Sequence, residues 1–364
     1  MLFLPDRAVR AGTRAAWLRR HQHPPSSLAR LLALLALLLP LQAAGASWWC
    51  AWMPWFPGCE QTDTPGGALR EVTDFGTNPG RLKMFEYLPP GLGTARPLVV
   101  ALHGCTQQAA SYDDEPGWVK YADQYHFALL LPQQQASNQP LSCFNWYNGA
   151  DNTRDQGEAL SIRQMIGKIV ADAGLNQQKV YITGLSAGGA MTAVMLAAYP
   201  ELFAGGAIIA GIPYKCAADS SEATSACGVP DNMKSLSPAA WGDLVRAATP
   251  YSGPRATVSL WQGSADTTVA PQDLQELMKQ WTNVLGVDQI PDLQDSIAGN
   301  EHKVYQDSAG KAQVETVLVA GMAHGTPINP GDGEGECGVP APYILNAGIC
   351  SSYYISKFWG LDLQ

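Results

Sequence analysis

The residues that most clearly suggest catalysis are Ser186 and its neighbours in the pentapeptide Gly184-Leu185-Ser186-Ala187-Gly188. The apolar run Val180 to Thr183 precedes it, and a run of small residues with helical composition, Ala187 to Ala198, follows it. A serine on a sharp turn between a strand and a helix is exposed for attack, and only small neighbours fit where the two elements approach. The alternative is a Gly-rich turn without chemistry. The flanking strand and helix favour a nucleophile at Ser186.

A serine hydroxyl needs a general base to take its proton and a carboxylate to hold that base in one tautomer. After a turn of this kind, the acid and then the histidine follow the serine along the chain. Of the six histidines, only His302 and His324 come after Ser186. His324 lies in a Gly-containing loop behind the apolar run Thr316 to Val319, so it is the expected base. His302 lies in a polar stretch and is expected to be a solvated surface residue.

Asp266 is the expected acid, because it comes directly after the apolar run Thr257 to Trp261. The carboxyl ends of strands are where open α/β sheets carry their active sites. The alternative for Asp266 is a turn or a cap for the helix expected from Pro271. Asp273 and Asp288 are expected in that helix and at its exit, and are weaker candidates.

Two backbone amides are expected to stabilise the negative oxygen of the tetrahedral intermediate. The amide of Ala187, directly after the nucleophile, is the first, and Cys105, in the loop after the apolar run Leu98 to Leu102, is the candidate for the second. His103 precedes the nucleophile and is interpreted as a structural residue of that loop rather than a base. Trp146 is a candidate for substrate binding, although packing in the core is an equally reasonable role.

The apolar pattern predicts the elements that position these residues. From about residue 81, short apolar runs alternate with longer segments of helical composition. The expected strands are Leu98 to Leu102, Ala128 to Leu131, Val180 to Thr183, Ala207 to Ala210, Thr257 to Trp261 and Thr316 to Val319. The expected helices are Glu158 to Ala173, Ala187 to Ala198 and Pro271 to Leu285. This alternation predicts the α/β class: one domain, residues 81–364, with a mostly parallel, doubly wound sheet and helices on both faces.

The N-terminus predicts a secretory signal over residues 1–46. Six Arg precede the apolar run Leu31 to Leu41, and Ala44-Gly45-Ala46 follows it. The run is shorter than the roughly 20 residues of a membrane span, so no membrane anchor is expected and the protein is predicted to be secreted or periplasmic. Loss of the signal would change the net charge from −9 to −14. Such an acidic protein is not expected to bind nucleic acid or anionic membranes.

Eight cysteines follow the predicted signal, and an even number in an exported chain favours disulfides over metal sites. No spacing typical of a zinc site occurs, so no metal is expected. Proximity along the chain predicts that disulfides staple the loops. The expected pairs are Cys50 with Cys59, in an N-terminal extension over residues 47–80, Cys105 with Cys143, Cys216 with Cys227, and Cys337 with Cys350.

Five segments carry a family resemblance: Leu102 to Gln107, Cys143 to Trp146, Gly157 to Ile162, Gly184 to Met191 and Ala207 to Tyr214. Over roughly residues 81–361 the chain resembles the α/β-hydrolase catalytic domains of extracellular polyhydroxybutyrate depolymerases and of related feruloyl and acetylxylan esterases. The resemblance implies hydrolysis of carboxylic esters through an acyl-enzyme, without a cofactor. It implies the roles already assigned: Ser186, His324 and Asp266 as the triad, and the amides of Cys105 and Ala187 for the oxyanion.

Four functions remain open at this point. The first is a secreted depolymerase or oligomer esterase acting on poly(3-hydroxybutyrate) or related hydroxyalkanoates. Because no linker or polymer-binding module follows the domain, soluble oligomers, amorphous polymer and other short-chain esters are expected in preference to crystalline polymer. The second is a feruloyl or acetylxylan esterase acting on plant cell walls. A lipase or peptidase, and a binding protein that has lost its chemistry, are the others. The oligomeric state is open.

Overall fold

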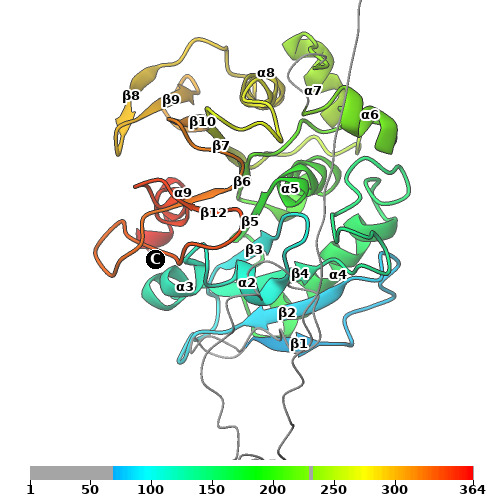
Figure 1. Cartoon of the computed structure of the whole chain (residues 1–364). Coiled ribbons are helices and arrows are strands. Elements are labelled where there is room, and N and C mark those ends of the chain that lie inside the picture. Colours follow the sequence, from blue (N-terminus) through cyan, green and yellow to red (C-terminus); the bar gives the residue numbers. More distant parts are fainter. Residues whose placement is uncertain (1–68, 229–232, 364) are drawn as a thin grey trace, which may run out of the picture. The chain divides into compact units, whose positions relative to one another are not determined.

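The computed structural model describes residues 69–228 and 233–363, which form a ten-stranded sheet and a separate two-stranded sheet (Figure 1). The strand order in the large sheet is β1-β2-β4-β3-β5-β6-β7-β10-β9-β8. Its strands are β1 (Arg70–Val72), β2 (Lys83–Tyr87), β3 (Leu98–Leu102), β4 (Ala128–Gln133), β5 (Val180–Leu185), β6 (Gly205–Ile209), β7 (Thr257–Gly263), β8 (Leu293–Ile297), β9 (Asn300–Gln306) and β10 (Ala312–Val319). The small sheet pairs β11 (Thr326–Ile328) with β12 (Ile344–Asn346) in parallel.

The central strands from β4 to β10 run parallel, and the strands at both edges run antiparallel to their neighbours. The six strands expected from the sequence are the six central ones, each within a few residues of its expected bounds. β1 lies within the predicted extension 47–80 and pairs with β2. The predicted signal, residues 1–46, and most of that extension lie outside the described residues.

Helices cover both faces of the sheet (Figure 1). They are α2 (Ala109–Tyr112), α3 (Trp118–Tyr125), α4 (Gly157–Asp172), α5 (Ala187–Ala198), α6 (Ser220–Ser225), α7 (Pro238–Arg246), α8 (Asp273–Leu285) and α9 (Ser351–Phe358), with short 3₁₀ turns at η3 (Pro200–Leu202) and η5 (Leu361–Leu363). The expected helices correspond to α4, α5 and α8. No helix in the described ranges is long and apolar enough to cross a bilayer.

The apolar side chains of the sheet form two cores, one on each face. Along β3, Leu98, Val100 and Leu102 belong to the core shared with α4, α5, α7 and α8, while Val99 and Ala101 belong to the core shared with α2, α3 and α9. A strand alternates its side chains between faces, so a strand buried on both sides is apolar throughout. The predicted doubly wound α/β fold is therefore confirmed.

His302 is not the solvated surface residue that its polar neighbourhood suggested. It lies in β9, is only 8% exposed, and bridges two carboxylates. Its Nδ1 lies 2.7 Å from Asp295 on β8, and its Nε2 lies 3.1 Å from Glu315 on β10. The prediction was wrong because these partners lie on neighbouring strands of the sheet edge, and only strand pairing brings them to the imidazole.

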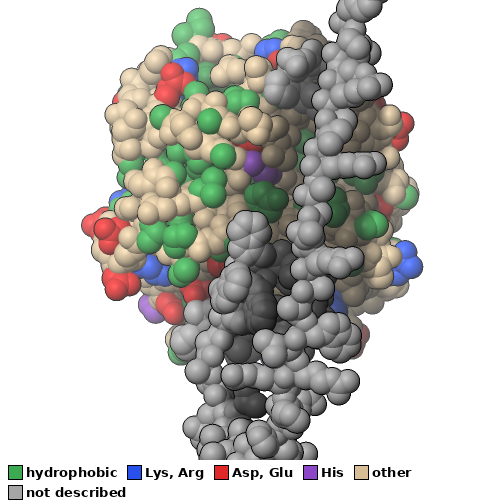
Figure 2. Space-filling view, in the orientation of Figure 1, with side chains coloured by type: hydrophobic (Ala, Val, Ile, Leu, Met, Phe, Trp, Pro, Cys, Tyr) green, Lys and Arg blue, Asp and Glu red, His purple; other side chains and the backbone are tan. Residues whose placement is uncertain are grey.

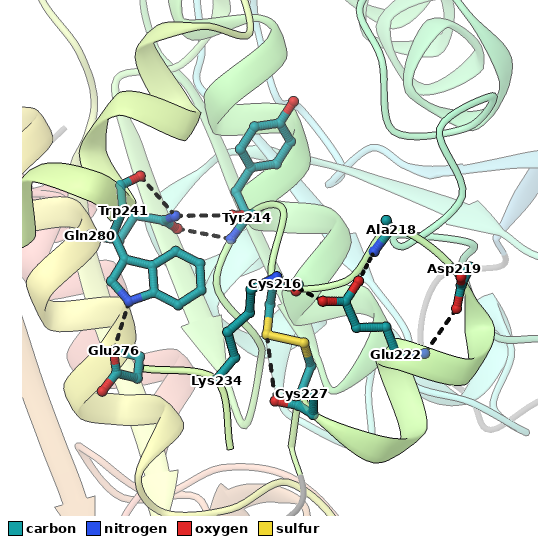
Figure 3. The surroundings of a disulfide bond; sticks show 11 residues. Tyr214, Cys216, Ala218, Asp219, Glu222, Cys227, Lys234, Trp241, Glu276 and Gln280 are labelled. Atoms are coloured by element: carbon teal, nitrogen blue, oxygen red, sulfur yellow. Dashed lines mark hydrogen bonds and ion pairs between the residues drawn. A yellow bond between two sulfur atoms is a disulfide. The ribbon is translucent and has the colours of Figure 1, made fainter. Parts of the chain in front are cut away.

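Three of the four predicted disulfides are formed in the described residues: Cys105–Cys143, Cys216–Cys227 and Cys337–Cys350. The predicted Cys50–Cys59 pair lies outside them. Figure 3 shows how Cys216–Cys227 closes the segment that carries α6 between β6 and β7. The Lys234 ammonium reinforces that closure, donating to the Cys216 carbonyl at 2.7 Å and to Glu222 at 2.8 Å.

Candidate active site

Ser186 occupies a strained turn between β5 and α5. Its φ is 58° and its ψ is −119°, a combination that a residue with a side chain rarely adopts. The turn is tight enough that a Cβ added to Gly184 would lie 2.4 Å from the carbonyl oxygen of Gly188. The Ser186 N–H donates to the Ile209 carbonyl of β6 at 2.9 Å, which fixes the turn against the next strand. Glycine at position 184 is therefore a steric requirement of this turn.

The loops that carry Asp266 and His324 lie side by side because β7 and β10 are parallel neighbours. The N–H of Ser264 donates to the Val319 carbonyl at 2.9 Å, and the N–H of Ala265 donates to the Met322 carbonyl at 3.0 Å. These bonds join the two loops as they leave the sheet. They bring His324 Nδ1 to 2.7 Å from Asp266 Oδ2.

The Asp266 carboxylate is 3% exposed and both of its oxygens are fixed by donors. Oδ1 accepts from the N–H groups of Thr268 at 2.8 Å and Val269 at 2.9 Å, while Oδ2 accepts from Gln262 Nε2 at 3.0 Å as well as from His324. A carboxylate only accepts, so the His324 proton sits on Nδ1 and the Nε2 lone pair is left available. This is the tautomer that a general base requires.

A cavity of about 250 Å³ opens at this edge of the sheet. Its lining residues are Gly104, Cys105, Thr106, Gln107, Leu141, Leu185, Ser186, Thr268, His324 and Tyr343. Ser186 and His324 thus face one space, although no hydrogen bond joins the Ser186 hydroxyl to the His324 ring in the described part of the chain. In proteins without bound substrate, such catalytic bonds are often long and tighten only in the complex.

Cys105 lies on the wall of the cavity and is held from two sides. Its disulfide to Cys143 and the 2.6 Å bond from the Thr106 N–H to the Leu141 carbonyl tie its loop to the segment 141–143. Within residues 69–228 and 233–363, the Cys105 N–H donates to no backbone acceptor. Ala187 begins α5 directly after Ser186. Of the two residues predicted to supply oxyanion donors, Ala187 therefore lies directly after Ser186, and Cys105 lies on the cavity wall.

Trp146 is not brought to this cavity. It is 8% exposed, belongs to the core beneath α4 and α5, and is absent from the described residues that line the pocket. Its ring packs edge-on against Tyr147, and its carbonyl accepts from Asn152 Nδ2 at 2.7 Å. The position of Trp146 therefore supports a role in core packing.

Three residues of this site were not anticipated from the sequence. Gln262 supports Asp266 from within β7, and a buried amide in an apolar strand is the signal that could have identified it. Leu141 and Tyr343 reach the cavity from two distant segments and are 57% and 42% exposed. The Tyr343 ring lies edge-on to His324, with 6.0 Å between ring centroids. Nothing local in the sequence marks either residue.

In the described ranges, no three residues among His, Cys, Asp and Glu are grouped so that they could hold a metal ion.

Asp273, the weaker candidate for the acid, begins α8 and is 1% exposed, and neither of its carboxyl oxygens has a hydrogen-bond partner in the described part. Burial, with repulsion from Glu276 and Asp266, raises its pKa to about 8. The folded protein therefore retains this proton at a pH where the unfolded chain has lost it. The stability contributed by the protonated group is complete below the unfolded pKa of about 4 and is lost as the pH rises through 8.

We expect Asp273→Asn to raise the melting temperature relative to wild type above about pH 8 and to leave kcat/KM within about twofold. The wild type loses this stability between the unfolded and the folded pKa, at about 1.4 kcal/mol per pH unit, so the difference should grow between about pH 4 and pH 8 and level off above that. Thermal unfolding followed by circular dichroism between about pH 5 and pH 9 measures it. A constant difference across that range would contradict the expectation.

The strand order and the strained turn at Ser186 between strand and helix define an α/β-hydrolase. Residues 82–299 match the family described as Esterase PHB depolymerase. The protein belongs to that family and is a carboxylic ester hydrolase.

Individual relatives are also named as esterases or depolymerases. The chain is 49% identical over 295 residues to Poly(3-hydroxyalkanoate) depolymerase C of Paucimonas lemoignei, with 81% of this chain and 70% of the relative covered. It is 33% identical over 268 residues to Feruloyl esterase B of Neurospora crassa, with 72% and 89% covered. The solved structure of an acetyl xylan esterase from Aspergillus awamori superimposes with a TM-score of 0.63 at 31% identity, covering 71% of this chain and 94% of that one.

Proposed function

We propose that the protein hydrolyses poly(3-hydroxybutyrate) or related hydroxyalkanoate oligomers through an acyl-enzyme on Ser186. The observation that carries the proposal is the hydrogen bond between His324 and Asp266 at the wall of the cavity that Ser186 lines. The 49% identity with a poly(3-hydroxyalkanoate) depolymerase supports the choice of substrate.

In the acylation step, Ser186 Oγ attacks the ester carbonyl while His324 Nε2 takes its proton. Asp266 holds the ring in the tautomer that can accept and stabilises the imidazolium that forms. The N–H groups of Cys105 and Ala187 donate to the oxyanion of the tetrahedral intermediate. His324 then returns the proton to the departing alcohol oxygen, the carbon–oxygen bond breaks, and the acyl group remains on Ser186.

Water completes the cycle by the same route. His324 removes a proton from water, the resulting hydroxide attacks the acyl carbonyl, and Ser186 leaves with a proton from His324. The products are a hydroxy acid or hydroxy-acid oligomer and an alcohol-terminated fragment. No step requires a redox partner or a cofactor.

The cavity suits an uncharged, short acyl unit. The ten described residues that line it include no Asp, Glu, Lys or Arg. Leu141, Leu185 and Tyr343 offer apolar surface for the methyl group of a 3-hydroxybutyryl unit. On the face drawn in Figure 2, hydrophobic and uncharged side chains occupy the middle of the described surface and acidic side chains lie mainly toward its edges. A neutral polyester that binds in the cavity would therefore not remove water from charged side chains, which would be energetically costly.

A second candidate is an esterase acting on feruloyl or acetyl groups of plant cell walls. It is favoured by the 33% identity with a feruloyl esterase and by the similarity to the solved acetyl xylan esterase. Both reactions use the same chemistry and differ in the acyl group that the cavity admits and in the alcohol that departs.

Product analysis separates these functions. The protein is incubated in parallel with amorphous polyhydroxybutyrate, feruloylated arabinoxylan and tributyrin. We expect hydroxybutyrate monomers or oligomers as the dominant products. Dominant release of ferulate would favour the second candidate, and dominant release of butyrate a general short-chain esterase. A parallel assay with p-nitrophenyl butyrate, with and without a serine-directed phosphonate, tests the chemistry itself. Activity indifferent to the phosphonate would contradict it.

We further propose that the protein is exported, with residues 1–46 as the signal and residues 81–364 as a single catalytic domain. Three disulfides in the described residues support export, because such bonds persist in oxidising compartments. Mass spectrometry of the N-terminus of the mature protein tests the cleavage position, which is expected after Ala46.

A further inference from the structure

Tyr343 lines the cavity together with Ser186 and His324, and the backbone around it fixes its position. The Thr326 N–H donates to the Tyr343 carbonyl at 2.8 Å. A Cβ added to Gly325, the residue after His324, would lie 2.7 Å from the same carbonyl oxygen. The turn that carries Tyr343 is thereby held directly against the loop that carries the base.

The turn is also closed on itself and anchored on its other side. Ala341 and Ile344 exchange both of their backbone hydrogen bonds, at 3.1 and 2.9 Å. Between them, the Pro342 carbonyl accepts from Gln107 Nε2 at 3.2 Å, and Gln107 belongs to the loop after β3. The Tyr343 backbone is therefore bonded to both walls of the cavity, although the residue itself is 42% exposed.

The Tyr343 ring lies on the side of the cavity where the alcohol departs. In the proposed mechanism, His324 Nε2 gives its proton to the alcohol oxygen, so that oxygen must come within about 3 Å of Nε2. The Tyr343 ring is edge-on to the His324 ring, with 6.0 Å between centroids, and both rings line one cavity of only about 250 Å³. The groups attached to the alcohol oxygen therefore lie beside the Tyr343 ring.

The polar side chains of the cavity offer few hydrogen-bond partners to an alcohol with many hydroxyl groups. Thr106 Oγ1 donates to the preceding carbonyl at 2.6 Å, and the Gln107 amide is bonded at both ends to backbone groups, at 2.8 and 3.2 Å. Apart from the proposed triad, the side-chain hydroxyls that remain among the described lining residues are those of Thr268 and Tyr343.

The two candidate substrates differ in the alcohol that meets this lining. The alcohol of a plant cell-wall ester is a sugar, and each of its hydroxyl groups that is buried without a partner is costly. The alcohol of polyhydroxybutyrate is the next 3-hydroxybutyryl unit, whose oxygen-bearing carbon carries a methyl and a methylene group. Such apolar groups are stabilised by burial against an aromatic ring.

We propose that Tyr343 is the residue that selects the departing alcohol. Its ring packs against the carbon that bears the alcohol oxygen and favours a secondary alkyl alcohol, as in the next unit of a polyester, over a sugar. The inference rests on the proposed Ser186 chemistry and adds to it the class of alcohol.

Butyrate esters that differ only in the alcohol isolate this contact, because they form the same acyl-enzyme and their values of kcat/KM differ only through binding and acylation. The probes are ethyl butyrate, sec-butyl butyrate and a methyl xyloside monobutyrate. Wild type should have a higher kcat/KM for sec-butyl butyrate than for the xyloside. We expect Tyr343→Ala to lower kcat/KM for sec-butyl butyrate about tenfold relative to ethyl butyrate, as the loss of contact with methyl-sized groups predicts. Tyr343→Phe, which keeps the ring, should hold this ratio within about twofold of wild type.

Two controls accompany these measurements. The acyl group is varied separately with ethyl acetate, ethyl butyrate and ethyl hexanoate, and Tyr343→Ala should change the ratios within this series by less than about twofold. Val339→Ala is the matched control variant, because Val339 is an apolar residue of the same segment, is 55% exposed, and is not among the described residues that line the cavity. It should leave every ratio unchanged.

An equal loss on all three alcohols would overturn the proposal, because Tyr343 would then support the His324 loop without contacting the alcohol. So would a changed acyl series with an unchanged alcohol series, or a wild type that prefers the xyloside. Failure of the proposed Ser186 chemistry has a different signature, since Ser186→Ala would then retain turnover of these esters whichever alcohol is preferred.

Discussion

Replacement of Ser186 by Ala is expected to lower kcat for ester hydrolysis by about 10⁶-fold while leaving the fold intact, as removal of the nucleophile does in subtilisin. The substitution removes only the hydroxyl group. Alanine keeps a Cβ of the same size at φ 58°, so the strain of the turn is unchanged. Hydrolysis of p-nitrophenyl butyrate measures the rate, and circular dichroism with thermal unfolding checks the fold.

Ser308→Ala is the matched control, because Ser308 is exposed in the turn between β9 and β10. It should retain wild-type activity. A serine-directed phosphonate should add its mass to the wild type and to Ser308→Ala but not to Ser186→Ala. Residual turnover in Ser186→Ala comparable with wild type, or a phosphonate adduct on that variant, would show that another residue is the nucleophile.

Asp266→Asn has the second largest expected effect, a fall in kcat of about 10⁴-fold by the precedent of the corresponding trypsin variant. The reason lies in the donors that face this carboxylate. Oδ1 accepts from two backbone N–H groups, those of Thr268 and Val269, so the amide oxygen of an Asn occupies that position and its N–H₂ group faces His324. The His324 ring must then accept at Nδ1, and its proton moves to Nε2, where it can no longer take the proton of Ser186.

Asp273→Asn is the control for Asp266→Asn, since it makes the same chemical change at a buried carboxyl that is not hydrogen-bonded to His324 in the described residues. Values of kcat/KM for the two variants, measured on the same ester, decide which acid serves the histidine. A large loss in Asp273→Asn with little change in Asp266→Asn would mean that the acid is misassigned. A melting temperature for each variant shows whether lost activity reflects unfolding.

The positions of Ser186, Asp266 and His324 could be anticipated because each follows a largely apolar run at the end of a central strand. A strand buried on both faces must be apolar, and parallel strands end at the same edge, so local composition places all three residues at one rim. The disulfide pairs Cys105–Cys143, Cys216–Cys227 and Cys337–Cys350 could be anticipated for a similar reason, since short separations along the chain favour closure of a loop.

Residues whose surroundings depend on distant partners could not be anticipated in this way. His302 lies in a polar stretch, and its burial depends on Asp295 and Glu315 from neighbouring strands. Trp146 lies in a segment whose aromatic residues suggested a pocket, but the packing of α4 and α5 places it in the core. Leu141 and Tyr343 reach the cavity only through the folding of separate loops.

The sequence by itself determined the class of sheet, the turn between strand and helix at Ser186, and which cysteines pair in the described loops, because these depend on strand composition and short-range closure. The tertiary structure decided which side chains line the cavity, which polar groups are buried, and that His103 is bonded to both Gly104 and Gln134. Such contacts join residues that local patterns cannot relate, since a hydrogen bond depends on distance and direction in space and not on separation along the chain.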